Sequence, residues 1–295
     1  MSPSHPAAAY AVVLGVAQDA GHPQAGCREV CCQAAWADPS LGHLVASLGI
    51  VDPRSGKRWI IDASPDLGKQ LHALDALQPR AAGSAPLDGI FLTHAHSGHY
   101  TGLVHLGRET MGSVGLPLFA MPRMSEFLRR NGPWSQLVEL DNVTLQPLED
   151  AQPIQLSDDL SIEPFLVPHR DEFSETVGFL VRGSSRSIAW LPDIDAWERW
   201  HRPIEDLIQS VDVAFIDGTF WDASELSRDI GEISHPLMHD SIERLGALPA
   251  TDRARVRFIH LNHTNPALRP DSSASATLTE RGFAIGRRGD VIPLS

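Results

Sequence analysis

The stretch FLTHAHSGHYTGL, residues 91–103, places three histidines within six positions. Alternate side chains of an extended backbone share a face, so His94 and His96 are expected to point the same way. A turn at Ser97-Gly98 can then bring His99 beside them. Zinc and similar ions bind three or four imidazole, carboxylate or thiolate ligands. The stretch therefore predicts part of a metal site, which other segments of the chain must complete.

Later segments supply ligands of the same kind, each after an apolar run. LVPHRDE contains His169, AWLPDID contains Asp193, and RFIHLNHTN contains His260 and His263. Positions three apart on a continuing strand face opposite sides, so the last two imidazoles are expected to serve different sites. Chance pairing is the alternative in a chain with fourteen histidines. The recurrence of ligand types favours a cleft for one or two metal ions.

Composition narrows the class of protein. The chain has 295 residues, an apolar fraction of 42% and a formal net charge of −13. One large layered domain can account for this length. The acidic balance, without clustered Lys and Arg, argues against a nucleic-acid partner. The apolar start AAAYAVVLGVA is too short to span a bilayer and has no basic segment before it, which predicts a cytoplasmic protein without a membrane partner.

Apolar, β-branched runs alternate with helical patterns along the chain. The pattern predicts strands within residues 10–17, 44–52, 57–66, 87–96, 117–121, 143–148, 160–171, 175–183, 187–193, 213–218 and 256–263. It predicts helices at residues 66–77, 122–131, 204–211 and 239–248, and a loop at 18–32. We expect a flexible tail at 1–9 and a single domain at 10–295. Two groups of strands with helices outside them favour an α/β fold, a four-layered αββα sandwich, although other layer orders fit the same periodicity.

The histidine motif resembles that of a known family. THAHSGH, followed by His169, Asp193 and His260, is similar to the metallo-β-lactamase superfamily pattern, HxHxDH with a later His, Asp and His. The resemblance covers nearly the whole chain and implies the metallo-β-lactamase fold. It also implies the metal ligands His94, His96, His99, His169, Asp193 and His260. The first, second and fourth of these would hold one ion, Asp193 would bridge, and the other two would hold a second ion.

Two subfamilies resemble the chain more closely. PQAGC, FIDGTFW, SHPLM and FIHLNHTNP are similar to the pyrroloquinoline quinone biosynthesis protein B (PqqB) group. The Cys-rich loop and the pair His260 and His263 are similar to the phosphodiesterase associated with carbon–phosphorus lyase. The PqqB group tends to lose the first two histidines of the motif. Because His94 and His96 are both present here, the chemistry of that group need not transfer.

Gly98 departs from the superfamily pattern, which has an aspartate at this position. A second metal ion would lack one ligand and would bind weakly or not at all. Asp19, in the loop after the first predicted strand, is a candidate replacement. The alternative is that Asp19 only stabilises a turn, as aspartates in loops more often do.

All three cysteines fall within six residues, at Cys27, Cys31 and Cys32. They are too close together for a disulfide framework, and an odd number of cysteines cannot all pair within one chain. Three thiolates and one histidine make a structural zinc site. The phosphodiesterase resemblance supplies His263 as the fourth ligand, and His22 is the alternative. Three buried thiols are the other interpretation, because C-x₃-C-C is not a standard zinc spacing.

Several further residues are candidates for supporting roles. Asp62 and Asp217 end apolar runs and could orient the ligating imidazoles, although for Asp62 a structural role is the expectation. Without an acid inside the HxHxxH motif, proton transfer would fall to Asp193, to His235 or to the substrate. His235 is similar to a histidine near the cleft of the PqqB group, although a surface histidine is the alternative. Arg170 is a candidate for substrate binding, with a solvated loop charge as the alternative.

The expected function follows from the metal. A bound ion lowers the pKa of its water to about 7 and polarises a phosphoryl or acyl oxygen. We expect a metal-dependent hydrolase acting through a metal-bound hydroxide on a small phosphodiester or cyclic ester, with zinc as the metal and iron or manganese as alternatives. The PqqB resemblance implies instead an iron-dependent oxidative enzyme acting on a peptide or amino acid, since two histidines and a carboxylate suit iron(II). A non-catalytic metal-binding protein is a third interpretation. The partner is then a small molecule or short peptide, and a homodimer is left open.

Overall fold

The computed structural model describes residues 8–225 and 234–295. Residues 1–7, most of the predicted flexible tail, lie outside the described residues. Ala9, at the end of that predicted tail, is buried, and its carbonyl accepts a hydrogen bond from the backbone N–H of Leu294 at 2.8 Å. The described fold therefore includes this residue.

Two seven-stranded sheets form the centre of the fold, and each combines parallel with antiparallel neighbours. The strand order of the first sheet is β14 (Val291–Pro293), β1 (Tyr10–Gly15), β2 (Ser47–Asp52), β3 (Lys57–Ile61), β4 (Gly89–Phe91), β5 (Leu116–Ala120) and β6 (Val143–Pro147). The order of the second is β13 (Ala284–Ile285), β12 (Val256–Ile259), β11 (Val213–Asp217), β10 (Ser187–Leu191), β9 (Val177–Arg182), β8 (Leu160–Leu166) and β7 (Ile154–Ser157).

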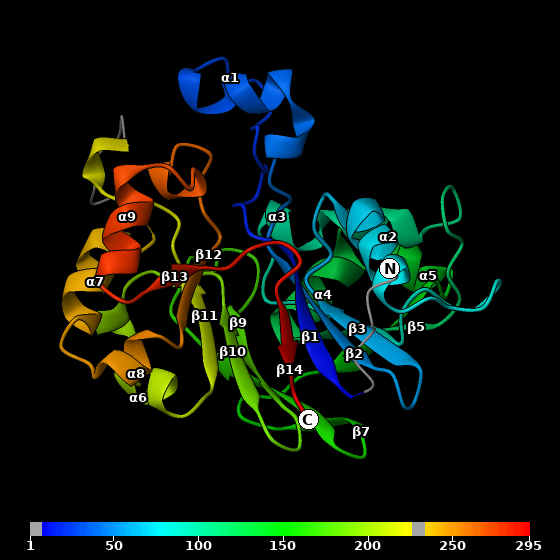
Figure 1. Cartoon of the computed structure of the whole chain (residues 1–295). Helices are drawn as coiled ribbons and strands as arrows, with labels where there is room; N and C mark the ends of the chain where they lie inside the picture. Colours follow the sequence, from blue (N-terminus) through cyan, green and yellow to red (C-terminus); the bar gives the residue numbers. More distant parts are fainter. Residues whose placement is uncertain (1–7, 226–233) are drawn as a thin grey trace, which may run out of the picture.

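Helices cover the outer faces of the two sheets (Figure 1). They include α2 (Leu67–Leu77), α3 (Ser97–Tyr100), α4 (Pro122–Arg130), α5 (Trp134–Glu139), α6 (Ile204–Gln209), α7 (Met238–Leu245), α8 (Ala250–Arg253) and α9 (Ser273–Glu280), whereas α1 (Val30–Ala37) lies away from both sheets. Short 3₁₀ turns include Thr101–Leu106 and Ala223–Glu225.

The buried apolar side chains fall into three groups, which match the three interfaces of a four-layered stack. One group, which includes Phe91 and Phe215, lies between the sheets. A second joins the first sheet to α2 and α4, and a third joins the second sheet to α6, α7 and α9. The predicted αββα sandwich is therefore confirmed.

The local sequence explains the main elements. All six residues of β1 are buried, because this strand lies between β14 and β2 in a sheet that is covered on both faces. In α2, Leu67, Leu71 and Leu74 recur at helical spacing and are buried against the first sheet. Continuous apolar runs thus form interior strands, and spaced leucines form the covering helix.

Parallel neighbours place the carboxyl ends of several strands at one edge of each sheet. Strands β3, β4 and β5 run parallel in the first sheet, as do β10, β11 and β12 in the second. Asp62 follows β3, His94 comes after β4, Asp193 follows β10, Asp217 ends β11 and His260 follows β12. The topology therefore collects polar side chains from distant segments at neighbouring strand ends.

Some elements differ from the sequence prediction. The predicted loop at 18–32 contains the start of α1, which projects from the sandwich (Figure 1) and leaves Trp36 56% exposed. The strands β13 and β14 have two and three residues and were not predicted. Such short strands form because a neighbouring strand offers pairing partners, so local periodicity does not reveal them.

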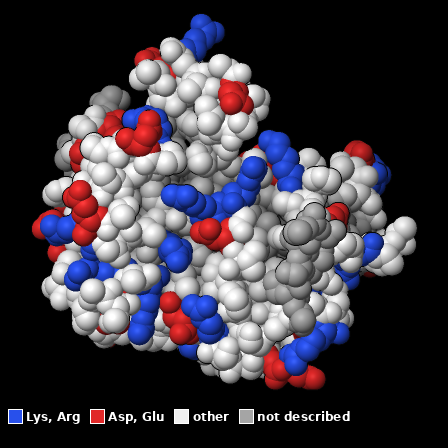
Figure 2. Space-filling view, in the orientation of Figure 1, with Lys and Arg blue, Asp and Glu red and all other residues white. Residues whose placement is uncertain are grey.

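Lys and Arg side chains mix with Asp and Glu on the face in Figure 2, and basic side chains gather over the segment between β13 and β14. Within the described part of the chain, no helix combines the length and the apolar character that a membrane crossing needs.

Candidate metal centre

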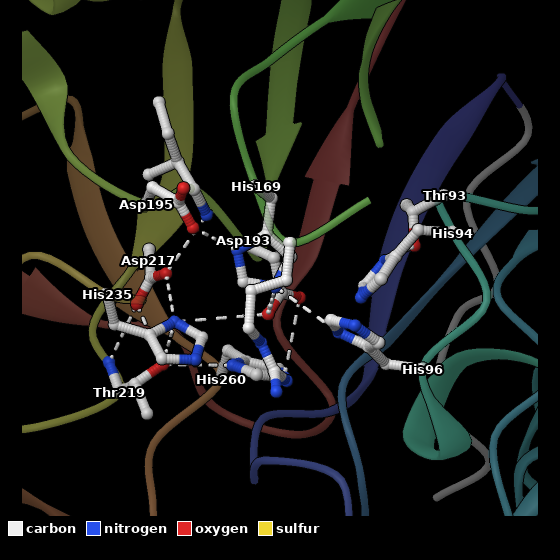
Figure 3. A network of polar contacts seen from close by, with 12 residues as sticks. Thr93, His94, His96, His169, Asp193, Asp195, Asp217, Thr219, His235 and His260 are labelled. Atoms are coloured by element: carbon white, nitrogen blue, oxygen red, sulfur yellow. Dashed lines mark hydrogen bonds and ion pairs between the residues drawn. The ribbon is translucent and has the colours of Figure 1, made fainter. Parts of the chain in front are cut away.

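Polar side chains from both sheets converge on Asp193 (Figure 3). Figure 3 shows His94 and His96 on one side of this carboxylate and His235 and His260 on the other. The structure brings together all six predicted metal ligands, His94, His96, His99, His169, Asp193 and His260. The carboxylate is only 2% exposed, so the centre is buried.

His94, His96 and His169 form the first group. Nε2 of His169 lies 3.2 Å from Nδ1 of His96. The ring centroid of His94 lies 4.4 Å from that of His96 and 5.3 Å from that of His169. One potential ligand atom from each residue lies within 4.8 Å of the other two. Oδ1 of Asp193 faces this group, 3.6 Å from Nε2 of His169.

His99 and His260 form the second group. Oδ2 of Asp193 lies 3.2 Å from Nε2 of His99 and 3.4 Å from Nε2 of His260. Oδ1 of Asp19 lies 3.6 Å from the same nitrogen of His99. Asp193 therefore presents one oxygen to each group, which is the arrangement of a carboxylate that bridges two ions.

The centre fits a bound metal on two counts. Ligand atoms about 2.0–2.2 Å from a tetrahedral ion lie about 3.3–3.6 Å from one another, and the three distances from Asp193 to imidazole nitrogens are 3.2, 3.4 and 3.6 Å. Nε2 of His94, His99 and His260 and Oδ2 of Asp193 are buried and have no hydrogen-bond partner within the described residues. Buried polar atoms rarely lack partners, and a divalent cation would satisfy all four.

Asp62 contacts one of the imidazoles directly and reaches a second one through Thr93. Its carboxylate accepts hydrogen bonds from Nδ1 of His99 at 2.7 Å and from the Thr93 hydroxyl at 2.9 Å. Because this hydroxyl donates to Asp62, its oxygen accepts from Nδ1 of His94 at 3.0 Å. Both imidazoles therefore direct Nε2 toward the centre.

Asp217 makes the same arrangement in the second sheet. It accepts from Nδ1 of His235 at 2.7 Å and from the Thr219 hydroxyl at 2.8 Å. The oxygen of Thr219 in turn accepts from Nδ1 of His260 at 3.0 Å. On each side of the centre, a carboxylate therefore orients one imidazole directly and a second imidazole through a threonine hydroxyl.

The imidazole pKa values divide into two sets. Burial, followed by the charge of His169, lowers the pKa of His96 to about 4. Burial also lowers the pKa of His94 and of His260, so these three rings are neutral at pH 7. His99 is the exception, because Asp62 and Asp193 outweigh burial and raise its pKa well above its ordinary value. Metal binding therefore requires His99 to release a proton.

Four side chains at the centre were not predicted from the sequence. Thr93 and Thr219 have the orienting contacts described above. Oδ1 of Asp195 lies 3.2 Å from Nδ1 of His169, and Glu172 lies 3.4 Å from Nε2 of His96. The threonines and Asp195 lie one or two residues from Asp217 or from a ligand, so proximity to those residues could have indicated them. Glu172 carried no such signal.

Arg170, the candidate substrate-binding residue, lies at the rim of the centre. Its side chain is 50% exposed, and its Nη1 is 3.8 Å from Oε1 of Glu172. His235, the candidate proton carrier, lies deeper. Its side chain is 8% exposed, and Nδ1 is 3.9 Å from Oδ1 of Asp193.

The cysteine cluster lies apart from this centre, at α1. The Sγ atom of Cys31 lies 3.7 Å from that of Cys27 and 4.0 Å from that of Cys32. Nδ1 of His263 lies 3.5 Å from Sγ of Cys31 and 3.4 Å from Sγ of Cys32. A tetrahedral zinc with bonds of about 2.3 Å to sulfur and about 2.0 Å to nitrogen separates two sulfurs by about 3.8 Å and sulfur from nitrogen by about 3.5 Å. The four side chains fit a structural zinc site.

The structure separates His260 from His263 for a reason other than the predicted one. Strand β12 ends at Ile259, and His260 has a φ of 61°, so the strand does not continue through His263. This left-handed turn, uncommon for a residue with a side chain, directs the first ring to the metal centre and leaves the second at the cysteines. His22, the alternative fourth ligand, donates its Nε2–H to the Cys31 carbonyl at 2.9 Å.

The layered fold, with histidines and aspartates gathered at its strand ends, defines a class, the proteins of the metallo-β-lactamase fold. Residues 57–261 match the beta-lactamase superfamily domain. This segment is more than half of the chain, and the chain therefore belongs to the beta-lactamase superfamily.

Among curated proteins, the chain is similar to coenzyme PQQ synthesis protein B. It is 29% identical to the protein from Xanthomonas oryzae pv. oryzae (strain MAFF 311018) over 307 residues, which cover 96% of this chain and 99% of the relative. It is 27% identical to that from Methylorubrum extorquens (strain PA1), with 97% and 100% covered.

Solved structures show the same fold. Zn²⁺-bound PqqB from Methylobacterium extorquens matches with a TM-score of 0.80 and 25% identity, over 97% of this chain and 100% of that one. A diphosphatase from the PhnP family matches with a TM-score of 0.69 and 21% identity, over 96% of each chain. The second likeness concerns the fold alone.

Proposed function

We propose that this protein is a metal-dependent hydrolase that acts on a small phosphodiester or cyclic ester. One observation carries the proposal: Asp193 lies between two groups of imidazoles, and its oxygens are spaced from their nitrogens as the ligands of a metal ion are. A divalent ion held there supplies a water of lowered pKa and polarises the phosphoryl or acyl oxygen of a substrate.

The side chains divide the remaining tasks. His94, His96 and His169 would hold one ion, and His99 and His260 would hold the other, with Asp193 between them. Asp62 and Asp217 keep the rings in the tautomer and orientation that the ions need. Burial of His94, His99, His260 and Asp193 keeps bulk water from these groups and strengthens their electrostatic effect on a bound substrate.

His235 is placed to donate a proton to the leaving group. Its Nδ1–H is committed to Asp217, so Nε2 is the nitrogen that remains for the substrate. Although burial opposes the charged form, Asp217 and Asp193 raise the pKa of His235, which favours a protonated ring at neutral pH. A buried imidazolium beside the centre suits the departure of an alkoxide from a phosphodiester. Arg170 at the rim would favour an anionic substrate.

The test uses zinc- and manganese-loaded protein with two probes, bis(4-nitrophenyl) phosphate and a 2′,3′-cyclic nucleotide. His94→Ala should abolish turnover. His235→Gln should lower kcat by about 10²–10⁴-fold with little change in KM, as expected for the loss of a proton donor. His72→Ala is the matched control, because His72 is exposed on α2. The proposal fails if the metal-loaded protein turns over neither probe, or if His94→Ala is as active as His72→Ala.

A second candidate function rests on the curated relatives, which are named for the synthesis of coenzyme PQQ. Histidine and carboxylate ligands also suit iron(II), so an oxidative step on a peptide or amino acid fits the same centre. Oxygen uptake separates the two proposals. Iron-loaded protein that consumes oxygen in the presence of a short peptide or an amino acid, and that hydrolyses neither ester probe, would favour the oxidative role.

A further inference from the structure

A side chain at position 98 would collide with Asp19 in its present position. A Cβ atom added to Gly98 would lie 2.3 Å from Oδ1 of Asp19 and 2.5 Å from its Cα. Both distances are shorter than any real contact of a Cβ atom, and the second involves backbone that cannot rotate away. Another residue fills the space that a side chain at position 98 would need, so the glycine is more than a simple loss of the superfamily's carboxylate.

That residue is Asp19, and its backbone is fixed to the segment that carries a metal ligand. Ala17 pairs with Val45 on one side and with Leu261 on the other. The backbone N–H of Gln18 donates to the carbonyl of Leu261 at 2.9 Å, directly after His260. Asp19 therefore enters the centre from the loop after β1, held against the end of β12.

The Asp19 carboxylate faces the second group of ligands. Oδ1 accepts a hydrogen bond from the Gly98 backbone N–H at 3.0 Å and lies 3.6 Å from Nε2 of His99. Potential ligand atoms of Asp19, His99 and His260 all lie within 4.8 Å of one another. Nε2 of both imidazoles is buried without a hydrogen-bond partner within the described residues. An aspartate that only stabilised its own turn would not be aimed at these nitrogens.

We infer that Asp19 is the carboxylate ligand of the second metal ion, moved from position 98 to the loop after β1, so that a side chain at 98 and the present position of Asp19 exclude each other. The inference rests on the proposed metal centre. It completes two sets of ligands, one on each side of Asp193. His94, His96 and His169 form the first set, and Asp19, His99 and His260 form the second. The Gly98 N–H orients the carboxylate, and the site holds two ions rather than one.

The test is zinc binding by equilibrium dialysis and the electron paramagnetic resonance spectrum of manganese-loaded protein. Asp19→Asn keeps an oxygen for the Gly98 N–H and removes the charge. It should lower the affinity for the second zinc ion by more than the 10–100-fold loss typical of a group that only orients a ligand. The coupled manganese spectrum of the wild type should give way to that of an isolated ion. Asp38→Asn is the control, because Asp38 caps an exposed turn.

Gly98→Ala tests the exclusion separately. It removes no ligand, yet it should displace Asp19 and thereby weaken the binding of the second ion. In the double variant Asp19→Asn/Gly98→Ala the two losses should not add, because they act on one interaction. Gly68→Ala on α2 is the matched control, since nothing lies within 4 Å of a Cβ there.

The outcomes separate the inference from the function on which it rests. Two zinc ions at the histidine centre of the wild type and one in Asp19→Asn would support the inference. Two ions of unchanged affinity in Asp19→Asn would overturn it and leave the metal centre intact, as would one ion in both proteins. No zinc at the histidines of the wild type would overturn both.

Discussion

Replacing Asp62 with alanine should weaken both the fold and the metal centre. The carboxylate is fully buried and accepts three donors: the backbone N–H of Thr93 at 2.8 Å, its hydroxyl at 2.9 Å, and Nδ1 of His99 at 2.7 Å. The hydroxyl can turn to another acceptor, whereas the other two donors cannot. Each buried donor left without a partner costs about 1–3 kcal/mol. The expected loss of stability in the metal-free protein is therefore roughly 2–6 kcal/mol.

The loss of metal affinity has a separate origin. Without the carboxylate, neither His94 nor His99 is held in the required tautomer, and affinity should fall by about 10–100-fold. Urea unfolding of the metal-free protein, followed by tryptophan fluorescence, measures the first effect, and zinc titration measures the second. Asp66→Ala is the control in the same segment, because Asp66 accepts from Val45 N–H at 3.1 Å outside the centre. Equal unfolding midpoints and equal zinc affinities for the two variants would refute this reasoning.

Three further predictions concern other parts of the molecule. His263→Ala should remove one zinc ion per chain, that of the cysteine cluster, and leave the histidine centre loaded; elemental analysis before and after the change measures this, and unchanged zinc content would contradict it. Asp217→Asn should lower the pKa of His235 toward its ordinary value, because the carboxylate that favours the charged ring is gone. The decline of kcat with rising pH should then begin at a lower pH than in the wild type. An unaltered pH profile of kcat would oppose this. Burial, followed by the charges of His22 and Arg288, lowers the pKa of His43 to about 4. The stability contributed by this neutral ring is present above pH 6.5 and is lost as the pH falls toward 4. Between pH 7.5 and pH 4.5, the free energy of unfolding in urea should therefore fall by about 1–2 kcal/mol less in His43→Gln than in the wild type, after allowance for partial exposure of the ring. Equal decreases in the two proteins would contradict the assignment.

Much of the fold could be predicted because its main strands are buried on both faces and read as apolar runs. Such runs include β1, β10 and β11, each followed by polar residues. The same property indicated the candidate ligands, since His94, Asp193 and His260 stand where apolar runs end. Short elements such as β13 and β14 depend on pairing with distant strands, and no local pattern marks them.

The missed parts of the centre depend on how distant segments pack. Glu172 contacts His96 across 76 positions of sequence, and no spacing rule joins them. The separation of His260 from His263 depends on a left-handed residue at a strand end, which the sequence gives no reason to place there. Gly98 looked like a missing ligand because the approach of Asp19, 79 positions away, is visible only in three dimensions.

The most direct measurement is the metal content per chain, by elemental analysis, of protein dialysed against buffered zinc, together with His94→Ala and Cys27→Ser. We expect three zinc ions in the wild type, two at the histidine centre and one at the cysteines. Cys27→Ser should lose only the cysteine-bound ion, and His94→Ala should lose zinc only from the histidine centre. Wild-type protein that binds no zinc beyond the ion lost in Cys27→Ser would contradict the metal centre and the hydrolytic function proposed for it.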